Sequence, residues 1–184
     1  MRTESPKWGS WSRAQRVLHW WGAGLVFAAF AISWVMVGVP LTELLVKFIL
    51  FQVHKTLGIL AFLATLARLV LRARRRRPED DASLPSWQVR AAARGHAALY
   101  VLLVATPVLG YFTASLAPLR IPTLFFGVIP LPALTGPNQQ WFVVVFALHR
   151  VCASTLILLA AGHAAMAIRH HVLGRDLLVR MWRG

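Results

Sequence analysis

Acidic residues are the scarcest chemical class in this sequence. Only 6 of the 184 residues are Asp or Glu, against 20 Lys and Arg, so the formal net charge is +14. Cysteine occurs once, as Cys152, which excludes an internal disulfide and a Cys-x-x-Cys metal site. Charged residues make up 14% of the chain and hydrophobic residues 58%, where soluble proteins have about 25% and about 45–50%. A chain this short cannot bury so much apolar surface in water, so a soluble enzyme and a disordered chain are both excluded.

Four long apolar segments predict the fold. They cover residues 17–38, 47–71, 96–117 and 141–168. Each has the ~20 residues that an α-helix needs to cross ~30 Å of hydrocarbon, and the alternation typical of strands is absent from them. The sequence therefore predicts an all-α integral membrane four-helix bundle, with residues 1–184 forming a single domain.

Basic residues are concentrated in three places that would lie on one side of the membrane. The N-terminal tail, the segment 72–95 and the C-terminal tail hold four, seven and four of the 20 Lys and Arg residues. Since positively charged segments stay on the cytoplasmic side, both termini are predicted to be cytoplasmic. The net charge is therefore explained by the orientation of the chain in membrane lipid, and no nucleic-acid partner is needed. The opposite loop, residues 118–140, is apolar with five prolines, and we expect it to form a short cap at the outer membrane surface.

Histidines inside the predicted spans are the candidate ligands, because polar side chains are costly in a membrane and are commonly functional there. His149 and His163 are 14 residues apart in the fourth segment, which places them on one helix face about 21 Å apart along the axis. The alternating direction of the helices puts His54 at the level of His149, and His19 at the level of His163. Each pair could hold one iron between two imidazoles.

The sequence favours two stacked haem groups over two alternatives. A zinc site needs three or four ligands near one point, which the separation along the fourth segment excludes for its two histidines. A single membrane histidine is often only a hydrogen-bonding residue between helices, but four histidines at two matched depths favour cofactor ligands. No C-x-x-C-H motif is present, so the haem would be non-covalent and of b type.

The histidines lie in an ordered set of motifs that extends from residue 13 to residue 182. These are L-H-W-W at His19, V-H-K-T-L-G at His54, R-G-H-A-A-L-Y at His96, L-H at His149, G-H-A-A at His163, and R-H-H followed by G-R-D-L-L-x-R-M. The combination resembles the prokaryotic cytochrome b561 family. The resemblance implies a multi-pass protein of the bacterial inner membrane, with two b haems and the same four histidine ligands. It also implies electron transfer between a periplasmic donor and the quinone pool, and some family members oxidise superoxide and reduce ubiquinone.

Four further residues are candidates for the chemistry around the haems. Lys55 and Arg150 each follow an outer ligand. A cation in a span costs about 2.5–3.5 kcal/mol, which haem propionates would offset, and the same charges could form a funnel for an anionic donor. His96 and His170, with His171, lie near the cytoplasmic side. Because histidine titrates nearest neutrality, His96 and His170 are the candidates for quinone contact and proton delivery; hydrogen bonding to lipid or haem carboxylates is the alternative.

Three functions fit these features. The first is a superoxide:ubiquinone oxidoreductase, in which a small anionic donor reduces the outer haem and quinone takes electrons from the inner haem with cytoplasmic protons. The second is an electron-transfer subunit that anchors a periplasmic redox protein, similar to the cytochrome b subunits of hydrogenases and formate dehydrogenases. The third is a non-redox helical transporter, which would contain no haem.

Overall fold

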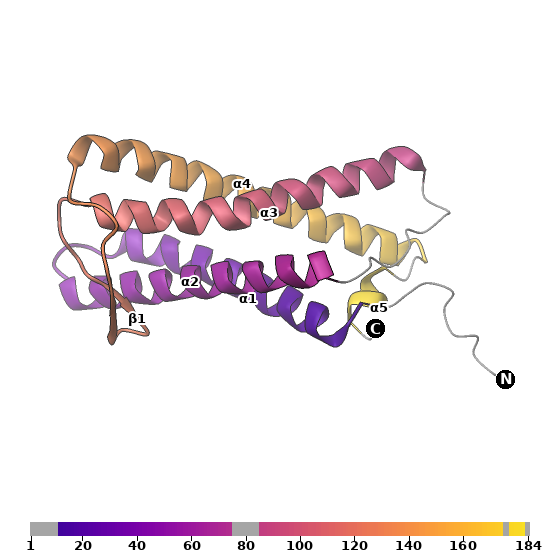
Figure 1. The fold of residues 1–184 in the computed structure, drawn as a ribbon, viewed down its shortest axis with the longest axis horizontal. Helices are drawn as coiled ribbons and strands as arrows, with labels where there is room; N and C mark the ends of the chain where they lie inside the picture. The colour runs from indigo at the N-terminus through magenta and orange to yellow at the C-terminus, as the bar shows by residue number, and fades with distance from the viewer. Residues whose placement is uncertain (1–10, 75–84, 175–176, 183–184) are drawn as a thin grey trace.

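Four long helices form the body of the protein in a computed structural model, which describes residues 11–74, 85–174 and 177–182. They are α1 (Arg13–Gly38), α2 (Leu44–Arg74), α3 (Ser86–Leu116) and α4 (Gln139–Val172), followed by the short helix α5 (Leu177–Trp182). Two short strands, β1 (Thr123–Phe125) and β2 (Ile129–Leu131), follow α3 and precede α4 in the chain, and β1 contacts α2 (Figure 1). All four long helices are long and apolar enough to cross a membrane, so the predicted all-α membrane bundle is confirmed.

The helices extend beyond the apolar segments that predicted them. For example, α3 begins at Ser86, ten residues before the predicted segment 96–117, and ends at Leu116. Hydropathy marks only the part of a helix that lies in hydrocarbon, while the helix itself continues into the polar interface until a cap ends it. Ser12 caps α1 in a capping box with Gln15, and the Asn138 side chain accepts a hydrogen bond from the backbone of Trp141 at the start of α4.

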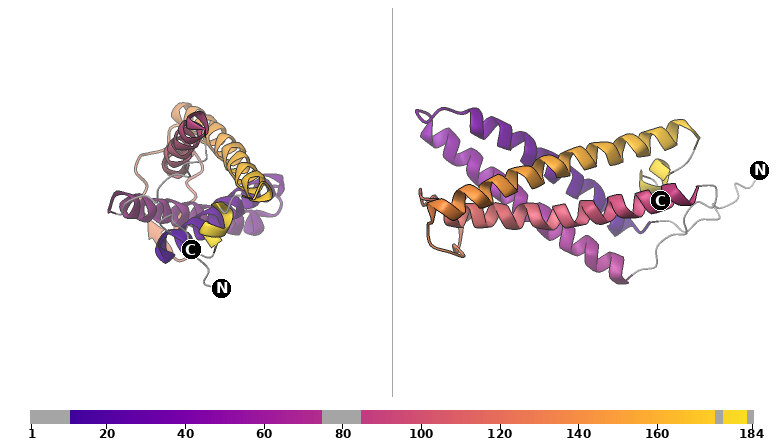
Figure 2. Two further views of the ribbon diagram at one scale, coloured as in Figure 1. Left: turned by 90° about the vertical axis from the view of Figure 1, so that its right-hand side faces the viewer. Right: turned by 90° about the horizontal axis from the view of Figure 1, so that it is seen from above.

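The helices are arranged as two packed pairs. Close contacts are most numerous between α1 and α2 and between α3 and α4, fewer join α2 to α3, and very few join α1 to α4. Figures 1 and 2 show the two pairs crossing, with the short helix α5 beside the start of α1. Arg16 Nη1 donates to the Trp182 carbonyl at 3.0 Å, and Trp20 Nε1 donates to the Met181 carbonyl at 3.1 Å. The described N-terminal and C-terminal ends therefore lie at the same end of the bundle.

The loop between α3 and α4 folds into an antiparallel hairpin over the opposite end of the bundle. Thr123 pairs with Leu131, and the turn places Phe126 and Gly127 at positive φ angles of 53° and 75°. The sequence predicted a cap here but not the strands. A left-handed conformation costs glycine little, and this explains the glycine at position 127, after Phe125 and Phe126.

Polar side chains of α2 hold this hairpin in place. Gln52, which is 4% exposed, donates from Nε2 to the Pro122 carbonyl and accepts from the Leu124 amide at Oε1, both at 2.9 Å. One turn later, Thr56 Oγ1 accepts from the Phe126 amide at 3.1 Å. These bonds satisfy backbone groups of the hairpin that no strand partner satisfies, so they fix the hairpin beside His54.

The distribution of polarity is the reverse of that in a water-soluble protein. Several buried side chains of the described residues are polar, while large apolar side chains such as Trp34 and Leu158 are 72% and 73% exposed. The buried polar residues are Gln52, Thr56, Thr65, Ser115 and His170. An apolar exterior of this extent is stable only against lipid.

The orientation of the bundle is testable with reporter fusions. The basic segments predict that the α5 end is cytoplasmic and that the hairpin end is periplasmic. A green fluorescent protein fused after Gly184 should fluoresce, and alkaline phosphatase inserted at Gly127 should be active. A fluorescent hairpin fusion with a dark C-terminal fusion would reverse the two levels of histidines.

Candidate cofactor-binding site

His54 on α2 and His149 on α4 form an outer pair near the hairpin end. Their ring centres are 6.3 Å apart, and the ring planes are inclined at 86°. His54 Nδ1 is 2.9 Å from the Ala29 carbonyl of α1, and His149 Nδ1 is 2.9 Å from the Thr106 carbonyl of α3. Since a carbonyl can only accept, each Nδ1 carries the proton and donates it. The Nε2 atom of each ring is therefore left with a lone pair, the state that a metal ligand requires.

The spacing of this pair fits two imidazoles that share one metal. Imidazole nitrogens bind metals at about 2.0–2.1 Å, and a ring nitrogen lies about 1.1 Å from its ring centre. Two rings on opposite sides of one metal should therefore have centres about 6.3 Å apart. Within the described residues, no cluster of three His, Cys, Asp or Glu could hold a bare metal ion. Two imidazoles that bind iron therefore need a macrocycle to complete the ligand set, and haem supplies such a macrocycle.

The packing around the outer pair leaves room for a flat group. Gly58 follows His54 by one turn, and a Cβ atom built on it would meet no heavy atom within 4 Å. Small residues lie one turn after each candidate ligand, namely Ala23, Gly58, Ala153 and Ala167, which predicts room for a macrocycle there. The few close contacts between α1 and α4 are in keeping with that prediction.

Gly110 on α3 is a part of the site that the sequence analysis missed. A Cβ atom at this position would lie 3.0 Å from His149 Cε1 and 3.3 Å from its Nδ1. Because Gly110 follows Thr106 by one turn, the same face of α3 accepts the imidazole proton and leaves room for the ring. No motif around Gly110 indicates this role, since only the packing of α3 on α4 creates it.

His19 on α1 and His163 on α4 form an inner pair. Their ring centres are 6.2 Å apart, with ring planes inclined at 70°, so the structure brings together both pairs that the sequence predicted. The hydrogen bonding differs from that of the outer pair. Arg68 Nη2 lies 3.2 Å from His19 Nδ1, and since a guanidinium can only donate, this Nδ1 accepts. Arg68 lies within the predicted apolar segment 47–71, where no sequence pattern indicates its role.

His96 on α3 is a third imidazole at the inner level. Its ring centre is 5.2 Å from that of His163, which is shorter than the spacing of two rings on opposite sides of a metal. His96 therefore packs against the inner pair and is not placed as a third ligand. His170, in the last turn of α4, is buried.

The two predicted outer cations are placed differently from each other. Lys55 Nζ donates to the carbonyls of Ile121 and Pro122 at 3.3 Å and 3.2 Å, so it contributes to holding the hairpin. Arg150 is exposed, with its guanidinium carbon 5.8 Å from the centre of the Phe146 ring. Only Arg150 has its charged group at the surface of the bundle.

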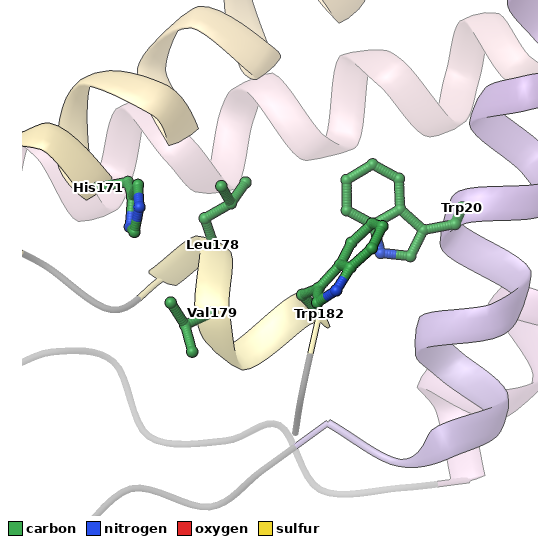
Figure 3. Close-up of a pocket in the computed structure, with 5 residues that line it drawn as sticks. All are labelled: Trp20, His171, Leu178, Val179 and Trp182. Atoms are coloured by element: carbon green, nitrogen blue, oxygen red, sulfur yellow. The ribbon is translucent and has the colours of Figure 1, made fainter.

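An apolar cavity of about 490 Å³ lies at the opposite end, between α1, α4 and α5. Its lining residues are Trp20, His171, Leu178, Val179 and Trp182 (Figure 3). The rings of Trp20 and Trp182 meet edge to face at 5.2 Å. The Trp20 ring also contacts that of His19, with centres 5.3 Å apart, so the cavity wall adjoins the inner pair.

The chain is similar to a described protein family and to several known proteins. A family model described as "Prokaryotic cytochrome b561" matches residues 10–184. The chain is 29% identical to "Cytochrome b561 homolog 1" of Escherichia coli (strain K12), covering 92% of this chain and 95% of that protein. It is 31% identical to "Cytochrome b561 homolog 2" of the same organism, covering 86% and 82%. A "Heme A synthase" of Bradyrhizobium sp. (strain ORS 278) is 31% identical over 85% of this chain but only 44% of that protein.

The role of Gly110 is testable by adding a side chain. Gly110→Val should displace the His149 ring and break its bond to Thr106, costing about 1–3 kcal/mol as other overpacking changes do. Gly24→Val is the matched control, because a Cβ at Gly24 meets nothing within 4 Å. Thermal unfolding of the protein in detergent should show a lower midpoint for Gly110→Val than for Gly24→Val. Equal midpoints would contradict the close packing of α3 against His149.

Proposed function

Because the chain belongs to the prokaryotic cytochrome b561 family of electron-transferring membrane proteins, we propose that it holds two b haems and carries electrons across the bacterial inner membrane. The observation that carries the proposal is the presence of two imidazole pairs, with ring centres 6.2 Å and 6.3 Å apart. One histidine of each pair lies on α4, and these two histidines are 14 residues apart. We assign His54 and His149 to the outer haem, and His19 and His163 to the inner haem. Haem supplies reversible one-electron chemistry when it is bound.

The residues around the outer pair orient the ligands and exclude water. The carbonyls of Ala29 and Thr106 hold the Nδ1 protons of His54 and His149, which fixes the ring orientation and increases the basicity of Nε2. Gln52 and Thr56 fasten the hairpin next to His54. The same bonds keep the hairpin backbone from opening a path for water to the outer haem.

We assign the electron acceptor, ubiquinone, to the cytoplasmic end. The cavity lined by Trp20, His171 and Trp182 is apolar, opens beside the inner pair and has room for a quinone ring. Reduction of one quinone to quinol takes two electrons and two protons. His170, His171 and His96 lie at this end of the bundle and are the candidates for delivering those protons.

Superoxide is the proposed donor at the periplasmic end. Two superoxide anions give up one electron each and leave as two O₂ molecules, which balances the reduction of one quinone. Arg150 places an exposed charge one residue after an outer ligand, and Lys55 places a second charge beside the hairpin. Positive charge near the point of electron entry increases the rate at which a small anion arrives.

The two-haem assignment is testable by removing ligands one at a time. A pyridine haemochrome assay should give two b haems per wild-type chain. His54→Ala or His149→Ala should remove the outer haem and keep most of the inner one, whereas His19→Ala or His163→Ala should do the reverse, because each pair lies at one level. His171→Ala is the matched control, since it removes an imidazole but no ligand. One haem or none in the wild-type protein would disprove the proposal and return the transporter hypothesis to first place.

The donor is testable through the salt dependence of haem reduction by superoxide. Salt shortens the reach of surface charge to about 10 Å at 0.1 M, so the second-order rate should fall as salt rises. Arg150→Gln should lower that rate with both haems retained. Arg169→Gln, at the other end of α4, should leave it unchanged. Lys55→Gln should also lower the rate, but it disturbs the hairpin, so Arg150 is the cleaner site.

Two other outcomes of this experiment would change the proposal. Haem reduction no faster than the spontaneous decay of superoxide would remove the oxidase activity, and an electron-transfer subunit for a periplasmic redox protein would then be the better hypothesis. Fast reduction without salt dependence would keep the activity and remove the role of the cations. Reduction potentials measured on the same variants separate an altered arrival rate from an altered driving force.

A further inference from the structure

Arg68 is a charged residue within a membrane-spanning helix. It lies on α2, six residues before that helix ends at Arg74. The one carboxylate side chain within residues 11–74, 85–174 and 177–182 is that of Glu43, which precedes the opposite end of α2. A guanidinium in a span is costly to keep and is normally paired with an anion.

Residues of two neighbouring helices, α1 and α3, direct the Arg68 side chain toward the inner pair. Nη2 donates to His19 Nδ1 at 3.2 Å, and the guanidinium carbon lies 5.4 Å from the centre of the Tyr100 ring. Gly22 on α1 is buried, and a Cβ atom there would lie only 3.9 Å from Arg68 Nη1. Tyr100 and His19 are both neutral groups, so these contacts hold the guanidinium without neutralising it.

The bond from Arg68 determines which nitrogen of His19 carries the proton. Because Nδ1 accepts from Arg68, a neutral His19 ring carries its proton on Nε2. The outer ligands His54 and His149 have the opposite tautomer, with Nε2 unprotonated. For His19 to bind iron through Nε2, the ring proton must be on Nδ1. Arg68 must then give up its hydrogen bond to Nδ1.

We propose that Arg68 is the binding residue for a propionate of the inner haem, and that it exchanges His19 Nδ1 for this carboxylate when the haem binds. The inference rests on the two-haem function proposed above. Haem carries carboxylates, and the planar fork of arginine matches a carboxylate in two parallel hydrogen bonds. The exchange frees His19 to ligate and gives the guanidinium its anion. A positive charge at this position also stabilises the reduced inner haem and so raises its reduction potential.

Arg72 provides a matched control for the test. It lies one turn further along α2, and its guanidinium carbon is 5.3 Å from the same Tyr100 ring. Arg68→Gln and Arg72→Gln therefore remove the same charge from the same aromatic ring, but only the first removes the contact with His19. Arg68→Lys keeps the charge and removes the fork.

The measurements are haem content, a redox titration of both haems, and the resonance Raman propionate bending mode, all on the purified full-length holoprotein. Arg68→Gln should shift the inner haem to lower potential and shift the propionate mode, with the outer haem unchanged. Arg68→Lys should restore part of both shifts, and Arg72→Gln should give wild-type values. If Arg68→Gln loses the inner haem altogether, retention of that haem by Arg68→Lys still supports the proposal.

Three results would overturn it. These are an unchanged potential and Raman mode in Arg68→Gln, equal shifts in Arg72→Gln, and complete loss of the inner haem in both Arg68 variants. Failure of the underlying function is distinguished beforehand, since a wild-type protein without two haems fails before any variant is compared.

Discussion

The position of His149 and His163 on one face of α4 is the constraint to which the other elements conform. With 14 residues between them, the two imidazoles face the same direction at two heights, about 21 Å apart. α2 must then bring His54 to the upper height and α1 must bring His19 to the lower one. Close helix packing is found within the α1–α2 and α3–α4 pairs, while both imidazole pairs join one helix pair to the other. The helix pairs are thus joined at two levels by imidazole pairs.

The two levels are prepared differently. At the outer level, backbone carbonyls of α1 and α3 fix the imidazole protons, and these carbonyls cannot move without the helices. The orientation of the outer rings is therefore fixed by the fold itself. At the inner level, a long side chain occupies the corresponding nitrogen of His19, and a side chain can rotate away. If both pairs ligate haem as proposed, the outer pair is preorganised, whereas the inner pair requires an exchange of partners.

The sequence predicted the parts of this structure that follow from periodicity and hydropathy. It predicted four spans and the pairing of His19 with His163 and of His54 with His149, because helical spacing and alternating direction determine face and depth. It did not predict the bonds from Gln52 to the hairpin, Gly110 beneath His149, or Arg68 beside His19. Each of these depends on how far one helix is rotated against another, and backbone carbonyls 70 residues away from Gln52 leave no pattern in the chain. His96 shows the same limit, since its depth was predictable but its contact with His163 was not.

The two cations near the imidazole pairs, Lys55 and Arg68, differ in the groups that they contact. Lys55, near the outer pair, is held by two carbonyl dipoles of the hairpin, which offset part of its charge. Arg68, near the inner pair, contacts neutral rings instead. A cation that lacks compensating dipoles attracts an anion strongly where the dielectric constant is low, so Arg68 is the better partner for a carboxylate in the proposed function. In the proposed function, electrons that enter beside the hairpin leave at the α5 end, where the Trp20 cavity adjoins the inner pair. The fold thus occupies Lys55 with the hairpin carbonyls and leaves Arg68 to a carboxylate that can displace His19.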